Sequence, residues 1–155
     1  LYHKIMKKIL VSLFALMSVF TAKAFVFDGI DLNGTIVQVT REVAQKGYIF
    51  DIEKQCLKGN CQGTEIYLSF NTEDTKDKTK IGQLIVEIPM AANATEAAAA
   101  YKNVTMLFNV IYHQTANANG VATYSVDTDG TTLDVCAKGN SVVLTYNTPS
   151  YKPKK

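Results

Sequence analysis

The sequence predicts one α+β domain in which two helices pack on one face of a mostly antiparallel sheet, in the order α-β-β-β-α-β-β-β. Three observations lead to this fold class. Two segments carry apolar residues at helical spacing. Six short segments alternate apolar and polar residues, as strands with one buried face do. Short links join these segments, and short links favour antiparallel neighbours with the helices gathered on the apolar face.

The first element is a predicted secretory signal peptide. Lys7 and Lys8 open it, an apolar run follows over residues 9–20, and the small residues Ala22 and Ala24 end it. The apolar run is shorter than the about 20 residues that a bilayer span requires. We therefore expect cleavage after Ala24, a periplasmic or secreted protein, and no membrane attachment after cleavage.

The signal peptide defines the domain limits. Residues 1–24 comprise the signal peptide with a short upstream extension before Met6. Residues 25–148 are the size of one domain, and residues 149–155 are predicted to be a disordered basic tail.

The two helices are predicted from apolar spacing and from their end residues. The first covers residues 35–46, with Asn33 as its cap and Gly47 as its stop. The second covers residues 95–113, where Asn93 and Glu96 form a capping pair. Their apolar faces comprise Ile36, Val39 and Val43 in the first helix and Tyr101, Val104, Phe108 and Ile111 in the second.

The six strands are predicted from period-two alternation, and no internal repeat is visible among them. A polar stretch without apolar residues, 71–80, is expected to be a long solvated hairpin loop. The predicted strands cover residues 48–53, 65–70, 83–88, 123–127, 132–137 and 142–147.

Charge limits the classes of partner. The whole chain has a formal net charge of +2, and removal of residues 1–24 takes away four lysines and no acidic residue, which leaves −2. Nucleic acid is held mainly through phosphate charge, so a near-neutral surface argues against it. We expect the partner to be a protein or a glycan.

The sequence gives little support to catalysis. His113 is the one histidine after the signal peptide, near the predicted end of the second helix, where the helix dipole favours a cation. No serine lies in a nucleophile elbow, and no acidic pair stands out. We therefore predict a non-catalytic binding module with no cofactor, and a small secreted hydrolase with a carboxylate-based site is the alternative.

The three cysteines favour a disulfide over a metal or redox site. A zinc site needs about four Cys or His ligands, and a thioredoxin-type switch needs two cysteines separated by two residues. Outside the inner membrane, the oxidising environment favours a bridge. We predict a Cys56–Cys61 bridge across turn material, with Cys136 as a free thiol, and a longer bridge from Cys136 to Cys56 or Cys61 remains open.

Partner contacts are predicted on the polar side of the sheet and in the long loop. Tyr67 lies on the polar side of its strand, and Asp74 and Asp77 lie in the loop 71–80. We expect these three side chains to meet the partner.

Two motifs carry a resemblance to known proteins. They are Phe27-Asp-Gly-Ile-Asp-Leu-Asn-Gly-Thr35 and Val43-Ala-Gln-Lys-Gly-Tyr48. Together with the order of elements, they resemble the opening of small secreted domains common in gut Bacteroidetes, and the chain looks like PepSY-type and β-lactamase-inhibitor-like modules. The resemblance implies a domain that binds or inhibits another protein, although a fold by itself does not fix a function.

Overall fold

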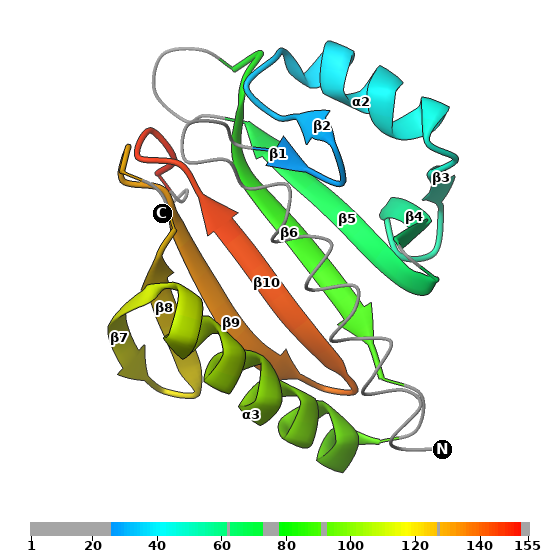
Figure 1. The fold of residues 1–155 in the computed structure, drawn as a ribbon. Coiled ribbons are helices and arrows are strands. Elements are labelled where there is room, and N and C mark those ends of the chain that lie inside the picture. The colour runs from blue at the N-terminus through cyan, green and yellow to red at the C-terminus, as the bar shows by residue number, and fades with distance from the viewer. Residues whose placement is uncertain (1–25, 62, 73–77, 91–92, 127, 153–155) are drawn as a thin grey trace.

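The computed structural model describes residues 26–61, 63–72, 78–90, 93–126 and 128–152 (Figure 1). The predicted signal peptide, residues 1–24, lies outside the described residues, as do Asp74 and Asp77 and the last three residues of the predicted tail. The elements are β1 (Val26–Phe27), β2 (Ile30–Asp31), α2 (Ile36–Gln45), β3 (Ile49–Asp51), β4 (Cys56–Cys61), β5 (Thr64–Thr72), β6 (Ile81–Pro89), α3 (Ala94–Ile111), β7 (His113–Ala118), β8 (Val121–Ser125), β9 (Thr132–Lys138) and β10 (Ser141–Asn147).

Eight strands form one sheet in the order β3-β4-β5-β6-β10-β9-β8-β7, and every pair is antiparallel. The strands β6 and β10, far apart in sequence, pair at the centre (Figure 1). The edges are β3 and β7. A separate two-stranded hairpin, β1 with β2, precedes α2 and contacts it.

The sheet consists of two similar halves. Each half is a helix followed by a four-stranded antiparallel meander, α2 with β3 to β6 and α3 with β7 to β10. One row of paired residues, one from each strand, runs across all eight strands, and its midpoint lies between Val86 and Leu144. The row is Phe50, Leu57, Leu68, Val86, Leu144, Val135, Ala122 and Asn117.

This repeat is not visible in the sequence because the two halves have connections of different length. Residues 73–80 join β5 to β6, whereas only 139–140 join β9 to β10. Equivalent strands therefore do not recur at one fixed spacing. A repeat is recognised in a sequence by such a fixed spacing.

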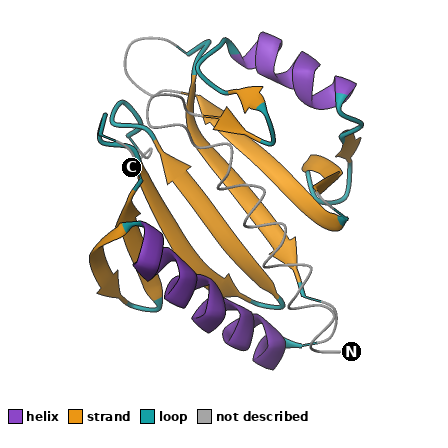
Figure 2. Ribbon diagram, in the orientation of Figure 1, coloured by secondary structure: helices purple, strands orange, loops and turns teal. Residues whose placement is uncertain are grey.

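The predicted fold class, α+β with the order α-β-β-β-α-β-β-β, is wrong. Strands dominate the described chain, as Figure 2 shows in orange, and each helix is followed by four strands. The sequence prediction missed the β1–β2 hairpin, β4 and β7. β4 contains Lys58-Gly-Asn60, which resembles a turn, and β7 is His-Gln-Thr-Ala-Asn-Ala, which has no apolar alternation.

Helix α2 begins at a reciprocal cap. The Gln38 amide donates to Thr35 Oγ1 at 3.3 Å, and the Thr35 amide donates to Gln38 Oε1 at 3.0 Å. The predicted cap, Asn33, instead donates to Asp31 Oδ1 in the preceding turn. Gly47, with φ +91°, follows the helix as predicted and takes the left-handed conformation that glycine favours.

Helix α3 begins at Asn93, whose side chain accepts from the Glu96 amide at 3.0 Å, in agreement with the predicted cap. It ends at Ile111, two residues earlier than predicted, and His113 opens β7. The helix lies across β9 and β10 (Figure 1). Neither α2 nor α3 has the length and apolar content that crossing a membrane requires.

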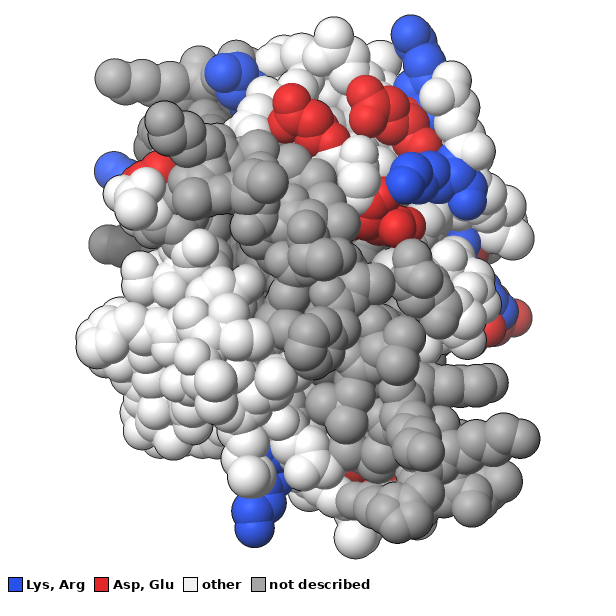
Figure 3. All heavy atoms as spheres, in the orientation of Figure 1, with Lys and Arg blue, Asp and Glu red and all other residues white. Residues whose placement is uncertain are grey.

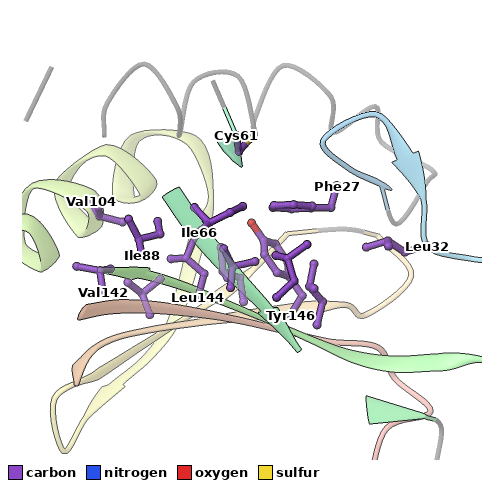
Figure 4. Packing of buried hydrophobic residues seen from close by; sticks show 14 of the residues in the cluster. Phe27, Leu32, Cys61, Ile66, Ile88, Val104, Val142, Leu144 and Tyr146 are labelled. Carbon is purple, nitrogen blue, oxygen red and sulfur yellow. The ribbon is translucent and has the colours of Figure 1, made fainter. Parts of the chain in front are cut away.

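The core lies on one face of the sheet, which we call the apolar face (Figure 4). Most of the inward positions predicted for the central strands are buried there. They are Ile66, Leu68, Leu84, Val86, Ile88, Tyr124, Leu133, Val135, Val142, Leu144 and Tyr146. The prediction fails at the β3 edge, where Phe50 and Ile52 are 60% and 76% exposed. It also fails at Ala137 of β9, which is exposed, and Phe70 and Val126 are only partly buried.

Candidate functional site

The opposite face of the sheet, which we call the open face, carries half-buried residues of the same central strands. Its side chains alternate with those of the core, as the two faces of a strand do. The row through Tyr67, Glu87, Val143, Cys136 and Val121 lies on this face. Polar and charged side chains gather here, so the open face is the candidate surface for a functional site.

A chain of hydrogen bonds crosses five strands of the open face. Asn71 Nδ2 donates to Gln83 Oε1 at 2.5 Å, and Gln83 Nε2 donates to Asn147 Oδ1 at 2.8 Å. Asn147 Nδ2 then donates to Asp134 Oδ2 at 3.2 Å, and Thr123 Oγ1 donates to Asp134 Oδ1 at 2.6 Å. Because cross-strand side-chain pairs stabilise a sheet, this chain helps to fix the register of β5, β6, β10, β9 and β8.

Tyr67 lies at the centre of a charged cluster on the same face. Lys54 Nζ lies 4.2 Å from the centroid of the Tyr67 ring, and Lys58 Nζ lies 6.0 Å from it. The Tyr67 hydroxyl donates to Glu65 Oε1 at 3.0 Å, and Lys58 Nζ lies 3.3 Å from Glu65 Oε2. Burial, together with the Glu65 hydrogen bond, raises the pKa of Tyr67, so this side chain remains a neutral phenol.

Glu87 connects this cluster to the other half of the sheet. Lys54 Nζ lies 3.5 Å from Glu87 Oε1, and the Ser141 hydroxyl donates to the same oxygen at 2.9 Å. Ser141 is only 6% exposed, so its hydroxyl is held in one place. Glu87 of β6 therefore adds a side-chain link between the two halves to the β6–β10 strand pairing.

A hollow of about 440 Å³ lies beside Glu87, and we call it the open-face hollow. Its volume is within the range of small-ligand sites. Lys54, from the β3–β4 connection, and Lys138, from the end of β9, carry its positive charges, whereas Ile85 and Val143 are its apolar residues. Its lining comprises Lys54, Ile85, Glu87, Lys138, Gly139, Asn140, Ser141 and Val143.

A second hollow of about 420 Å³ lies on α2, lined by Ile36, Val37, Thr40, Arg41 and Ala44. Among the described residues its lining comes from one helix, with Arg41 as the charged side chain. The open-face hollow instead joins side chains from separate segments, as small-ligand sites with a few convergent polar groups do. We therefore take the open-face hollow as the candidate site.

The structure contradicts the predicted Cys56–Cys61 bridge. The two residues are the ends of one strand, β4, so at about 3.3 Å per residue their Cα atoms are about 16 Å apart. A disulfide needs Cα atoms within about 7 Å. An odd separation also directs the two side chains to opposite faces, and Cys61 belongs to the core cluster (Figure 4).

The longer bridges from Cys136 are also incompatible with this sheet. Cys136 lies on the open face of β9, four strands from β4, which corresponds to about 19 Å at the usual strand spacing. Cys61 lies on the apolar face, so the sheet separates it from Cys136. No two cysteines of the chain are within bonding distance.

Thiol mapping tests these positions. Burial raises the pKa of all three thiols, to about 12 for Cys61, where Asp28 adds to the effect. Cys136 is half-buried while Cys56 is buried, so Cys136 should react first with an alkylating reagent at neutral pH. Peptide mapping without reduction should give no Cys56–Cys61 link, and recovery of that linked peptide would contradict the observed β4.

Of the predicted partner contacts, Tyr67 lies in the charged cluster but is only 8% exposed, so the prediction of an exposed contact residue is wrong there. Asp74 and Asp77 lie outside the described residues. Sequence reasoning missed the side chains that line the open-face hollow, Lys54, Glu87, Lys138 and Ser141. Glu87 had one usable signal, its position on the polar side of an alternating strand. His113 is exposed on the β7 edge, and within the described ranges no three His, Cys, Asp or Glu side chains converge as metal ligands would.

Comparisons with protein-family models, with curated proteins and with solved structures found no match to this chain. The resemblance to PepSY-type and β-lactamase-inhibitor-like modules therefore remains a prediction.

Proposed function

We propose that this chain is a non-catalytic binding module of the periplasm or the extracellular space. Its open-face hollow receives an acidic group of a partner protein, and the chain acts as an inhibitor of that protein. The observation that carries the proposal is the convergence of Lys54, Glu87, Ser141 and Lys138 from separate segments around one hollow.

The charge balance of the hollow favours an acidic group. Glu87 is occupied by Lys54 and Ser141, and Lys138 is exposed at the rim. Two lysines against one glutamate leave one positive charge, which a carboxylate would neutralise through charge-assisted hydrogen bonds. Ile85 and Val143 provide apolar contact for the carbon atoms that carry this carboxylate.

The carboxylates of the open face favour binding over the hydrolase alternative. Asp134 accepts from Thr123 and Asn147, and Glu87 is held by Ser141 and Lys54. Carboxylates that are held by neighbouring side chains in this way are suited to fix a surface in place. A proton-transferring carboxylate must instead reach the reacting group.

Charge reversal at the rim tests the proposal. Protein immobilised on beads should retain a specific protein from the periplasm or medium of the organism that encodes it. Lys138→Glu should reduce that capture about tenfold, because it places a like charge against the acidic group. The measurement is quantitative mass spectrometry of the retained protein at low and high salt, since screening should weaken the contact.

Lys102→Glu is the matched control, because Lys102 is an exposed lysine on α3 and lies away from the hollow. It should retain the partner as the unaltered chain does. Equal capture by Lys138→Glu would refute the role of the hollow. Loss of capture after enzymatic removal of glycans would instead assign the ligand to a glycan.

A further inference from the structure

The side chain of Lys54 extends over strand β5 to reach the open-face hollow. Its backbone lies in the connection between β3 and β4, whereas its Nζ atom lies 3.5 Å from Glu87 Oε1 on β6. The order of the sheet here is β3-β4-β5-β6, so β5 lies between these two places. The lysine therefore crosses β5, and a residue of that strand lies beneath it.

That residue is Tyr67, whose ring faces the ammonium group. Lys54 Nζ lies 4.2 Å from the ring centroid, within the distance at which the face of an aromatic ring attracts a cation. Although Tyr67 lies on the open face, it is buried. The carbon stem of a lysine can cover apolar surface while its charged end stays in water, and the Lys54 side chain is 43% exposed. The ring therefore supports the lysine, and the lysine shields the ring from water.

The Tyr67 ring is itself held in place. Its hydroxyl donates to Glu65 Oε1 at 3.0 Å, and Lys58 Nζ lies 3.3 Å from Glu65 Oε2. The backbone of Tyr67 pairs with Lys58 of β4 on one side and with Glu87 of β6 on the other. A lysine side chain has much rotamer freedom to lose when it is ordered, whereas this ring is ordered already. Contact with the ring therefore limits the positions that the Lys54 ammonium group can take.

The Lys54 ammonium group keeps a donor for a ligand. An ammonium group has three N–H donors and no acceptor. Glu87 and the face of the Tyr67 ring engage it from two directions. The remaining direction is open to an acidic group in the hollow that Lys54 lines.

The lysine pair on the helix-covered side of the molecule has a different role. Figure 3 shows that charged side chains on that side gather around α2 and the β1–β2 hairpin, with a broad white area over α3. There Lys46 Nζ lies 3.9 Å from Asp28 Oδ1, and the Tyr48 hydroxyl donates to Asp28 Oδ2 at 3.2 Å. These contacts attach the hairpin to the residues that follow α2. Lys54 instead lies at the wall of a hollow, where its ammonium group can meet a ligand.

We propose that Tyr67 is a positioning residue of the open-face hollow, because its ring holds the Lys54 ammonium group where an aliphatic carboxylate enters. Tyr67 acts through Lys54 and does not touch the carboxylate. The inference rests on the proposed function, in which the hollow receives an acidic group. A cation that is already in place does not have to be ordered when the carboxylate binds, so the ring strengthens binding.

The position of Lys54 can be measured by NMR without any ligand. A methylene group that lies over the face of an aromatic ring resonates upfield of the same group in water. The Lys54 ε-methylene signal, assigned by its loss in Lys54→Met, should be upfield in the unaltered chain and in Tyr67→Phe, which keeps the ring. In Tyr67→Leu it should move to the position of an exposed lysine. The Lys138 signal is the control and should not move, because Lys138 lies on the other side of the hollow.

Titration with pentanoate measures the effect on binding. This probe combines a carboxylate with an alkyl chain for Ile85 and Val143, and the amide signals of Ser141 and Val143 report its binding. Tyr67→Leu should raise the dissociation constant about fivefold, and Tyr67→Phe should leave it within about twofold. In a chain that carries Lys54→Met, Tyr67→Leu should cause no further loss, because the group that the ring positions is gone.

Three results would overturn the proposal. They are a Lys54 signal at the exposed-lysine position in the unaltered chain, a Lys54 signal that Tyr67→Leu does not move, and an equal loss of pentanoate affinity from Tyr67→Leu with and without Lys54→Met. The first of these needs no variant at Tyr67, so the proposal can be refuted even if Tyr67→Leu does not fold. Failure of pentanoate to bind the unaltered chain would instead refute the acid site of the proposed function, and the Lys54 signal would still decide whether Tyr67 positions Lys54.

Discussion

Replacing Leu144 with alanine should lower the free energy of unfolding by about 2–5 kcal/mol. Leu144 is fully buried in β10, at the centre of the sheet, where it pairs with Val86 and Val135, which are also fully buried. The cavity left by three missing carbon atoms cannot be refilled by a close-packed core. Urea denaturation followed by circular dichroism measures the change. A loss of this size is a large part of the about 5–15 kcal/mol that stabilises a typical domain.

Thr145→Ala is the control, because Thr145 is the next residue of the same strand and lies half-buried on the open face. It should change the free energy of unfolding by less than about 1 kcal/mol. If Leu144→Ala costs no more than Thr145→Ala, the assignment of the apolar face is wrong at the centre of the sheet.

The centre of the sheet could be predicted because one physical rule determines it. In β6, β9 and β10 each alternate residue must face the core, so the periodicity of Leu84, Val86 and Ile88 is visible without knowledge of the neighbours. Helix ends follow equally local rules, which explains the agreement at Asn93 and Gly47. Asn33 and Thr35 both suit a cap, and local composition does not decide between them.

The outer strands could not be predicted from alternation because they are not half-buried. β7 is almost fully exposed, so no apolar period marks it. A different signal was present, since Asn119 and Gly120, both with positive φ, form the tight turn between β7 and β8. An Asn-Gly pair is a strong indication of a hairpin, and it would have supplied the missing strand.

The candidate site depends on pairing between distant strands. Glu87 and Ser141 meet only because β6 pairs with β10 at the centre of the sheet, and sequence spacing does not show this pairing. Tyr67 was identified from its place on the polar side of a strand, but its two lysine neighbours come from the β3–β4 connection and from β4. The cysteine bridge failed for the same reason, because Lys58-Gly-Asn60 resembles a turn in isolation.

The glycine in that segment also has a tertiary role, because an aromatic ring packs on it. Gly59 lies in β4 with its backbone against the ring of Tyr48, and a Cβ atom at this position would lie 2.2 Å from the ring. Tyr48 is 3% exposed, and its hydroxyl donates to Asp28 Oδ2 at 3.2 Å, so the ring links β4 to the β1–β2 hairpin. Burial, with the Asp28 charge as a second cause, raises the pKa of Tyr48, and the phenol stays neutral.

Gly59→Ala should therefore destabilise the fold by about 1–3 kcal/mol, since the ring is enclosed and has no room to move. The test is a double-mutant cycle with Tyr48→Ala, measured by urea denaturation. Because removal of the ring removes the clash, the double variant should cost less than the two single variants together by about 1–3 kcal/mol. Gly139→Ala is the control: apart from its chain neighbours no atom lies within 4 Å of its Cβ position, so its cost of about 1 kcal/mol comes from the positive φ. Gly139 lies in the β9–β10 turn, in the other half of the sheet, so this cost should add to that of Tyr48→Ala without coupling. Strict additivity of Gly59→Ala and Tyr48→Ala would show that the ring does not lie on Gly59, and the position of β4 in the sheet would have to be revised.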